Sequence, residues 1–237
     1  MIIAGMNFSL HFVTWHNQTV RHYAQDPEWK TYLVFLFVLS ILVSLVLIHH
    51  EIYDIDGAFR RGIFGVVSVA TTTGFSTADY GLWPTFVPFL LLMSAFIGAC
   101  AGSTGGGIKI IRLLLLFKQG SREIKRLIHP NAVIPIKLGN KPVGSRVIDA
   151  VWGFLAAYVL IFSILMLICM ALGEDPITAY SAVGASLNNL GPGLGDATLN
   201  YASLADGSKY VLAFAMLLGR LELFTLLVVL SPAFWER

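Results

Sequence analysis

Four long apolar blocks constrain this chain more than any other feature of its sequence. Each block reaches or nearly reaches the roughly 20 residues that an α-helix needs to cross the hydrocarbon core of a bilayer. The blocks are Tyr32–Ile48, Pro84–Phe117, Val147–Leu172 and Tyr210–Trp235. Charged residues make up 13% of the 237 residues, roughly half of their share in a soluble domain. The sequence therefore predicts an all-α integral membrane protein with at least four spans.

The charges between the blocks predict which side each connection faces. Bases gather between the second and third blocks, where Glu123 is the single opposing acid; they are Lys118, Arg122, Lys125, Arg126, Lys137, Lys141 and Arg146. The positive-inside rule makes this linker, residues 120–142 with its flanks, cytoplasmic. The other connections are acidic and are predicted to lie outside. Their acids would concentrate cations at an entrance or simply solvate the loops.

A basic segment can also bind nucleic acid or an anionic lipid surface. Because this segment lies between two spans, its bases are best explained as marking the cytoplasmic side of the membrane. We therefore expect contact with the lipid bilayer and no nucleic acid partner. Pro130, Pro135 and Pro142 interrupt the segment, which predicts helix only in its first half, Lys118–Leu127.

The chain contains an internal repeat, and repeats set the architecture of a fold. Residues 27–119 and 143–237 each follow the order span, short amphipathic stretch, polar turn, span. The short stretches, Asp56–Ala70 and Asp175–Leu187, cannot cross a bilayer at 1.5 Å per residue, yet they are too apolar for a solvated loop. A half-membrane helix that enters and returns satisfies both conditions. The sequence thus predicts two tandem span, pore-loop, span repeats.

Each short stretch is followed by a turn rich in Thr, Asn and Gly, which is Thr71–Phe75 in the first repeat and Asn188–Gly193 in the second. Non-helical backbone at membrane depth is tolerated only where protein or a water-filled cavity satisfies its polar groups. Glycine lets backbone carbonyls turn inward around a dehydrated cation, and the C-terminal poles of the short helices would favour that charge. The candidate filter residues are Thr72, Thr73, Gly74, Phe75, Asn188, Asn189, Leu190 and Gly191. Taken singly, either segment could be an ordinary turn.

The repeat, with TTTGF in its first unit and NNLGPG in its second, resembles the third and fourth repeats of the Trk/Ktr potassium transporter family. The resemblance covers essentially the whole chain. It implies a fold of the potassium-channel-like superfamily, potassium as the transported ion bound at the filter residues, no covalently bound cofactor and a place in the cell inner membrane as a multi-pass protein. In that family four loops surround one pore, each with one filter glycine, here Gly74 and Gly191.

Two loops cannot coordinate an ion on all sides, so the two N-terminal repeats must come from a longer chain or from another polypeptide. The resemblance also implies a homodimer and a cytoplasmic ring of nucleotide-binding regulatory subunits, with Lys118–Arg146 as the candidate docking surface. Met1–Val13 is too short to span, and we expect it to be the tail of a preceding inner helix. Residues 1–26 would then comprise that tail and a cytoplasmic link.

The second block must be broken, because Pro84–Lys118 as one helix would be about 50 Å long, against a bilayer core of about 30 Å. The break is predicted at Gly98–Gly107, a run of small residues with poor helix propensity. Close helix packing is the alternative; a phosphate-binding loop is excluded, because Lys109 is neither adjacent to the last glycine nor followed by Ser or Thr. In the resembled family the equivalent loop obstructs the path beneath the filter. This implies a gate formed by Gly102, Ser103, Thr104, Gly105, Gly106 and Gly107.

Arg220 lies near the middle of the last block, with Glu222 two residues later. A charge at membrane depth is costly and marks a functional site by default. The family resemblance implies that Arg220 stands beside the gate loop as an electrostatic barrier to cations, and a structural ion pair is the alternative. We expect Lys109 and Arg112 to extend toward the inner membrane surface.

Enzymatic chemistry is not predicted. His50-Glu51 starts a zinc-protease HExxH pattern, but Asp54 occupies the position of the second histidine. Cys100 and Cys169 both lie in apolar blocks, where a small buried thiol is the simplest explanation.

Two alternatives to an ion pore stay open. One is a secondary transporter with broken helices, which an inverted repeat would accompany, and the other is a non-conducting structural membrane subunit.

Overall fold

The structure is a computed structural model that describes residues 1–139, 141–198, 200–221 and 223–235. The helices are α1 (Phe8–His16), α2 (Arg21–Gln25), α3 (Pro27–His49), α4 (Ile55–Ala70), α5 (Phe86–Ile97), α6 (Ile110–Ile128), α7 (Ser145–Ala171), α8 (Pro176–Leu187), α9 (Asp206–Arg220), α10 (Leu223–Leu230) and α11 (Pro232–Trp235). Short 3-10 turns cover Tyr80–Leu82 and Gly195–Ala197. Strands β1 (Lys137–Leu138) and β2 (Lys141–Pro142) form a small antiparallel hairpin. Glu222 lies outside the described residues.

Helices α3 and α7 are the longest, with 23 and 27 residues, or about 35 and 40 Å. Within the described part of the chain, these two helices are long and apolar enough to cross a membrane. Their outer faces remain apolar, since Phe37 is 67% exposed and Leu160 is 60% exposed. Such faces suit contact with lipid or with further protein rather than with water. The prediction of a mainly helical fold is confirmed, apart from the short hairpin β1–β2.

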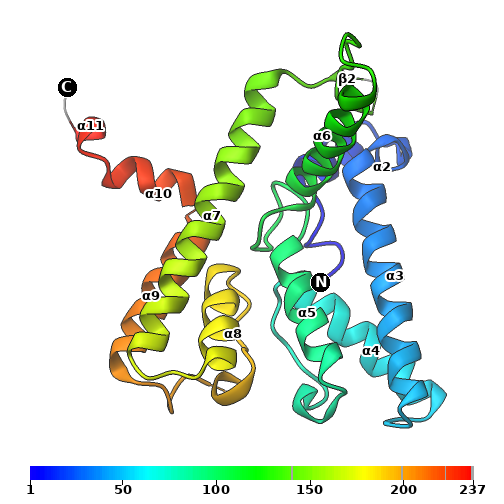
Figure 1. The fold of residues 1–237 in the computed structure, drawn as a ribbon. Helices are drawn as coiled ribbons and strands as arrows, with labels where there is room; N and C mark the ends of the chain where they lie inside the picture. The colour runs from blue at the N-terminus through cyan, green and yellow to red at the C-terminus, as the bar shows by residue number, and fades with distance from the viewer. Residues whose placement is uncertain (140, 199, 222, 236–237) are drawn as a thin grey trace.

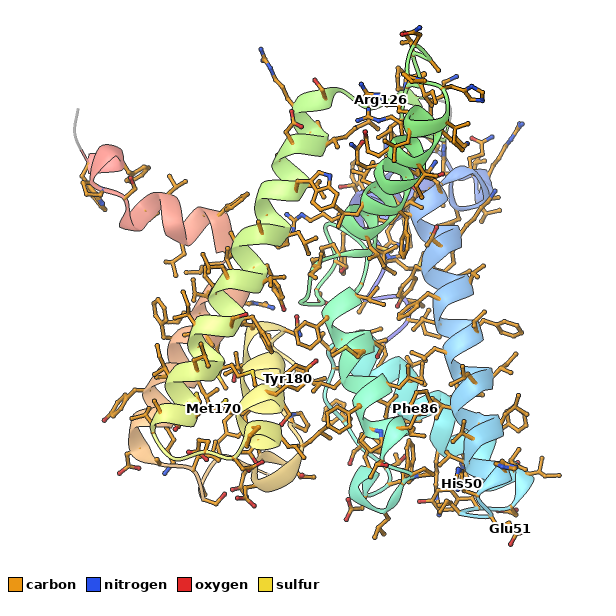
Figure 2. All side chains as sticks on the ribbon, viewed as in Figure 1. His50, Glu51, Phe86, Arg126, Met170 and Tyr180 are labelled. Carbon is orange, nitrogen blue, oxygen red and sulfur yellow. The ribbon has the colours of Figure 1, made fainter. Side chains whose placement is uncertain are left out.

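Two packed groups of helices lie side by side (Figure 1). One apolar core lies among α3, α4 and α5, and a second lies among α7, α8 and α9. Tyr180 on α8 joins the groups, because its ring centroid lies 6.3 Å from that of Phe96 and 6.4 Å from that of Phe89, both on α5 (Figure 2). These aromatic contacts join α5 of the first group to α8 of the second.

The short helices end where the sequence predicts, α4 at Ala70 and α8 at Leu187. They contain 16 and 12 residues, so their lengths are about 24 and 18 Å, less than a bilayer core. Helix α8 starts at the lower end of the molecule in Figure 1 and stops part of the way along α7. The turns that follow both helices therefore lie inside the protein.

The second apolar block is broken, as predicted, between α5 and α6. The non-helical segment runs from Gly98 to Lys109 and so includes two residues beyond the predicted glycine-rich run. We call Gly98–Lys109 the gate loop. Helix α6 continues through Lys118–Leu127 to Ile128, which agrees with the helix predicted for the first half of the basic linker. The hairpin that follows was not predicted.

The last apolar block is not one span. Helix α9 ends at Arg220, α10 begins at Leu223, and α11 begins at Pro232, where the missing backbone N–H favours a helix start over a continuation. In Figure 1, α10 turns sharply away from the line of α9. The prediction of a continuous helix over Tyr210–Trp235 is therefore wrong.

The first residues also differ from expectation. A helix tail was predicted for Met1–Val13, but residues 2–6 form turns, and α1 starts at Phe8 with the side chain of Asn7 accepting a hydrogen bond from the Ser9 N–H at 2.8 Å. The turns exist because this segment pairs with the gate loop. The Cys100 N–H donates to the Gly5 carbonyl oxygen at 2.9 Å.

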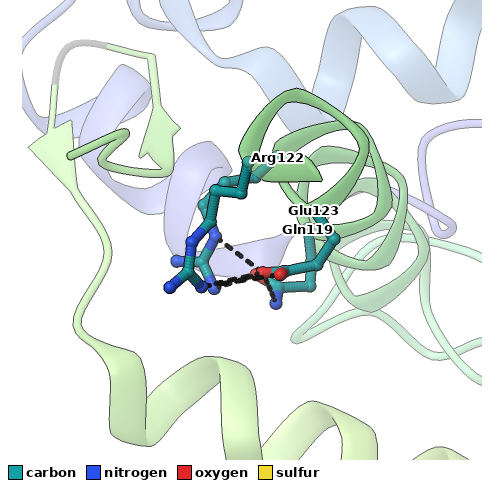
Figure 3. A network of polar contacts seen from close by, with 4 residues as sticks. Gln119, Arg122 and Glu123 are labelled. Atoms are coloured by element: carbon teal, nitrogen blue, oxygen red, sulfur yellow. Dashed lines mark hydrogen bonds and ion pairs between the residues drawn. The ribbon is translucent and has the colours of Figure 1, made fainter. Parts of the chain in front are cut away.

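The two ends of the molecule carry different side chains. Arg126 lies at the upper end in Figure 2, whereas His50 and Glu51 lie at the lower end. On α6, Glu123 accepts from Gln119 at 2.8 Å and pairs with Arg122 at 3.1 Å (Figure 3). Exposed pairs of this kind add little stability. Arg126 and Glu51 thus lie at opposite ends of the molecule, and the side of the membrane that each end faces stays a prediction.

Candidate functional site

The turns after α4 and α8 have the same backbone geometry. Thr72 and Asn189 both adopt positive φ angles, 52° and 54°, which are uncommon for residues other than glycine. In each turn a backbone N–H reaches back five residues: Thr73 donates to Ser68 and Leu190 donates to Ala185, both at 2.8 Å. This pattern terminates a helix and leaves the next carbonyls directed away from the helix axis.

The two turns touch each other at Gly74. Its φ is 79°, and a Cβ atom there would clash with the Leu190 carbonyl oxygen, so both the backbone angle and the close approach require glycine. Gly191, the corresponding residue of the second turn, has φ 101°. The sequence-predicted residues Thr72–Phe75 and Asn188–Gly191 are therefore gathered in one place.

Hydroxyl groups brace the first turn from behind. The Thr71 hydroxyl donates to the Val67 carbonyl at 2.7 Å and lies 2.8 Å from the Thr73 hydroxyl. The Ser68 hydroxyl donates to the Phe75 carbonyl at 2.6 Å. These bonds hold the Thr71 and Thr73 side chains and the Phe75 carbonyl against α4.

Amide and phenol groups brace the second turn. The Tyr158 hydroxyl on α7 donates to Asn188 Oδ1 at 2.8 Å, and Asn188 Nδ2 donates to the Gly184 carbonyl at 2.8 Å. The Tyr201 hydroxyl donates to the Gly191 carbonyl at 2.7 Å. The sequence predicted neither tyrosine: Tyr158 is 30 residues from Asn188, and Tyr201, ten residues from Gly191, follows an irregular segment with no periodic pattern.

The gate loop closes against both turns. The Gly106 N–H donates to the Thr72 hydroxyl oxygen at 2.8 Å. A Cβ atom on Gly106 would clash with the Asn188 carbonyl, and one on Gly105 would lie 3.2 Å from the Thr71 carbonyl oxygen. The closest approach of the loop thus falls at two of its glycines, Gly105 and Gly106. These two predicted gate residues lie against the predicted filter, whereas Gly102 and Thr104 contact the N-terminal segment through Phe8 and Ala4.

A cavity of about 450 Å³ borders the gate loop, and its wall includes Gly102–Gly107, Asn189 and Arg220. Lys109 and Arg112 also line it, which corrects the expectation that both reach the inner membrane surface. Lys109 Nζ donates to the Gly105 carbonyl oxygen. The Arg112 guanidinium lies 4.0 Å from the centre of the Phe154 ring on α7, a cation–π distance.

Arg220 stands at the C-terminal end of α9, where a positive charge complements the helix dipole. The preceding residue, Gly219, packs so closely on the second turn that a Cβ atom would clash with the Leu187 carbonyl. This contact places the side chain of Arg220 on the cavity that the gate loop borders. The cavity wall is therefore rich in positive charge.

The chemistry that this arrangement offers comes from backbone and hydroxyl oxygens. Among the described residues, no group of three or more His, Cys, Asp or Glu side chains could hold a metal ion. Carbonyl oxygens are the ligands that replace the water of a dehydrated monovalent cation. The backbone oxygens of the two turns belong to this ligand type.

Comparisons with known proteins agree with this chemistry. The family described as TrkH, cation transport protein, matches residues 1–237. A Trk system potassium uptake protein TrkH from Halomonas elongata is 50% identical over 237 residues, which are 100% of this chain and 49% of that protein. A Trk system potassium uptake protein TrkG from Escherichia coli is 36% identical over 235 residues, 99% of this chain and 48% of that protein.

The crystal structure of the potassium transporter TrkH from Vibrio parahaemolyticus superposes with a TM-score of 0.94 at 48% identity, covering 99% of this chain and 51% of that one. The chain thus spans about half the length of the relatives it matches. These relatives are named as transport proteins rather than enzymes. The fold, the membrane-length helices and the match over every residue lead to one conclusion: the chain belongs to the TrkH family of cation transport proteins.

Proposed function

We propose that this chain forms half of a potassium uptake pore, as two span, pore-loop, span repeats. The observation that carries the proposal is the pair of turns after α4 and α8, which share one backbone geometry and meet at Gly74 and Leu190. The relatives are named as potassium uptake proteins, which supports potassium as the cargo.

The filter would consist of carbonyl oxygens from Thr72–Phe75 and Asn188–Gly191. Partial dehydration of potassium is offset when several such oxygens replace its water, and the C-terminal poles of α4 and α8 add negative potential. The Phe75 and Gly191 carbonyls already accept hydroxyl hydrogen bonds, so each has one lone pair left for an ion. The strongest ion contacts are then expected at Thr72–Gly74 and Asn189–Leu190.

The gate loop would block the path below the filter. Its bond to the Thr72 hydroxyl and its close packing at Gly106 support a closed position. Opening requires the loop to leave this contact. Arg220, together with Lys109 and Arg112, would raise the electrostatic barrier to cations in the cavity.

The remaining pore would be completed by two further pore-loop repeats in a multi-pass protein of the cell inner membrane. The exposed apolar faces of α3 and α7 are consistent with contact with lipid or with those repeats. As further parts of the proposal, the transporter is a homodimer, and a cytoplasmic ring of nucleotide-binding subunits docks on the basic segment Lys118–Arg146. Both short helices start at the same end of the molecule, which favours a parallel repeat over the inverted repeat of many secondary transporters.

The test is ion selectivity of the complete transporter in proteoliposomes. Gly74→Ser should reduce the potassium over sodium permeability ratio by about tenfold or more, because the φ of 79° and the contact with the Leu190 carbonyl would be lost. Gly139→Ser is the matched control, since Gly139 also has a positive φ, 58°, but has no other described atom within 4 Å of its Cβ position. An unchanged ratio in the Gly74 variant would remove the filter assignment.

A further inference from the structure

A buried carboxylate lies at the base of the gate loop, outside the site described above. Glu28, in the first turn of α3, is 5% exposed. Carboxylates are rarely buried to this degree, because removing the charge from water is costly unless partners compensate for it. Hydrogen-bond or charged partners of Glu28 must therefore offset the free-energy cost of removing its carboxylate from water.

Its hydrogen-bond partner lies in the gate loop. Glu28 Oε1 accepts a hydrogen bond from the Ala101 N–H at 2.6 Å, across 73 residues of sequence. Helix α6, which follows the loop, also packs against α3. Glu28 thus ties the start of α3 to the gate loop.

Lys109 supplies the opposite charge at the same place. Lys109 directly precedes α6 and exerts a weak electrostatic attraction on Glu28. Its ammonium donates to the Gly105 carbonyl in the part of the loop that contacts the first turn. Its φ of 79° is strained for a residue with a side chain and persists only where the surroundings hold it. We call Glu28 and Lys109, which both bond to the gate loop, the clasp.

The clasp is not needed to start α3. Asp26 already caps that helix, because its side chain accepts a hydrogen bond from the Trp29 N–H at 2.7 Å. The bond from Glu28 goes instead to the gate loop. Its position indicates a role in holding the loop rather than in forming the helix.

We propose that Glu28 is a positioning residue that keeps the gate loop closed beneath the filter, with Lys109 as its partner. The inference rests on the proposed function insofar as the loop is a gate. Because Lys109 directly precedes α6, a displacement of α6 relative to α3 would release the loop. Helix α6 carries basic side chains of the predicted cytoplasmic side. A displacement of α6 would therefore act on the gate loop through Glu28 and Lys109.

Two measurements on the complete transporter in proteoliposomes test the role of Glu28: potassium flux, and the rate at which N-ethylmaleimide labels Cys100, resolved by mass spectrometry. Cys100 lies in the gate loop and is 1% exposed, and Cys169 on α7, also 1% exposed, is the internal reference. The variants are Glu28→Ala, which removes the acceptor, and Glu28→Gln, which keeps an acceptor oxygen without the charge. Asp26→Asn is the matched control, since Asn also caps helices.

Glu28→Ala should raise Cys100 labelling by about tenfold or more, as expected for loss of a charge-assisted hydrogen bond, while Cys169 labelling stays constant. Glu28→Gln should give a smaller increase, and Asp26→Asn none. If the labelling rate of Cys100 and the potassium flux both rise, the results support Glu28 as a positioning residue and the loop as a gate. If labelling of Cys100 rises with unchanged flux, Glu28 positions the loop but the loop is not a gate.

Two results would overturn the inference. One is Cys100 labelling that is unchanged, or raised equally, in the two Glu28 variants with a normal Cys169 rate; an equal rise would follow from loss of the Glu28 charge alone, because burial and then that charge raise the pKa of the Cys100 thiol. The other is faster labelling of both cysteines in Glu28→Gln, which would mean that the protein loosens as a whole. Because thiol labelling does not require transport, a failure of the proposed function cannot be mistaken for a failure of the clasp.

Discussion

The two helix groups follow the same order but break their last helix in different ways. In the first group, α5 and α6 are separated by the gate loop, which folds under both turns. In the second group, α9 ends at Arg220 and packs through Gly219 on the second turn. The same order of elements therefore ends differently in the two groups. In the proposed pore, the first group would supply the obstruction and the second a positive charge beside it.

The two turns are also stabilised by different groups. Hydroxyl groups on α4 brace the first turn within its own segment, whereas the second turn depends on Tyr158 from another helix. The first turn also bonds to the gate loop through Thr72. The gate loop thus has a hydrogen bond to the first turn and a close backbone contact with the second, at the Asn188 carbonyl. We expect loss of the Tyr158 bond, which lies behind the second turn, to affect mainly stability.

The largest expected effect comes from Gly106→Ala, which tests whether the first group supplies the obstruction. The new Cβ atom would clash with the Asn188 carbonyl, at a cost of about 1–3 kcal/mol for overpacking. The closed loop becomes less populated, so unregulated potassium flux should rise about ten- to a hundredfold. Gly120→Ala on α6 is the control, since no other described atom lies within 4 Å of its Cβ position. Equal flux in both variants would contradict the gate.

Arg220→Gln tests the role given to the second group. Removal of one charge near the ion path lowers the barrier by about 1 kcal/mol, which corresponds to roughly fivefold more single-molecule conductance. Arg126→Gln is the matched control, because Arg126 lies on exposed α6 and pairs with Glu123 at 3.5 Å. A fall in conductance for Arg220→Gln would assign Arg220 a structural role instead.

Tyr158→Phe tests the different bracing of the two turns. It removes the donor to Asn188 Oδ1 and leaves a buried acceptor unpaired, which should cost about 1 kcal/mol of stability. Tyr180→Phe serves for comparison, since its hydroxyl contacts only the Met93 sulfur, at 3.6 Å, among the described groups. Thermal unfolding in detergent measures the melting temperature of each variant. An equal decrease in the two variants would show that the Tyr158–Asn188 hydrogen bond adds no stability beyond that of the Tyr180 contact.

The smallest effect concerns the starts of α4 and α8. The Asp175 side chain caps α8 through the Ile177 and Thr178 N–H groups, at 3.0 and 3.1 Å, whereas Asp54 makes no such bond within the described part of α4. Asp175→Ala should cost about 0.5 kcal/mol, and Asp54→Ala less. Melting temperatures of the two variants at neutral pH provide the comparison, and a greater loss with Asp54→Ala would reverse the assignment of the cap.

The same cap has a defined pH dependence. Hydrogen bonds from Thr178, first its side chain and then its backbone, lower the pKa of Asp175 below its ordinary value. The carboxylate therefore stabilises the fold above its unfolded-state pKa, and this contribution is lost as the pH falls through the lower folded-state pKa. The difference in stability between wild type and Asp175→Ala should shrink only in acid; a constant difference across that range would exclude the cap.

Local features were predictable from the sequence. The ends of α4 and α8 follow from Thr, Asn and Gly after an apolar run, and the break before α6 follows from the excess length and the glycines. Contacts between distant segments were not predictable. Glu28 and Ala101 are 73 residues apart, and no periodic pattern links them. For the same reason the sequence did not predict that Lys109 and Arg112 line the cavity.

The central claim is that carbonyl oxygens of the two turns bind the transported cation. The most direct measurement is the anomalous scattering of rubidium, a potassium substitute, in crystals of the complete transporter. The account predicts a peak on the pore axis within coordination distance of carbonyl oxygens from Thr72–Gly74 and Asn189–Leu190. Rubidium bound elsewhere, with those carbonyls turned away from it, would contradict the account.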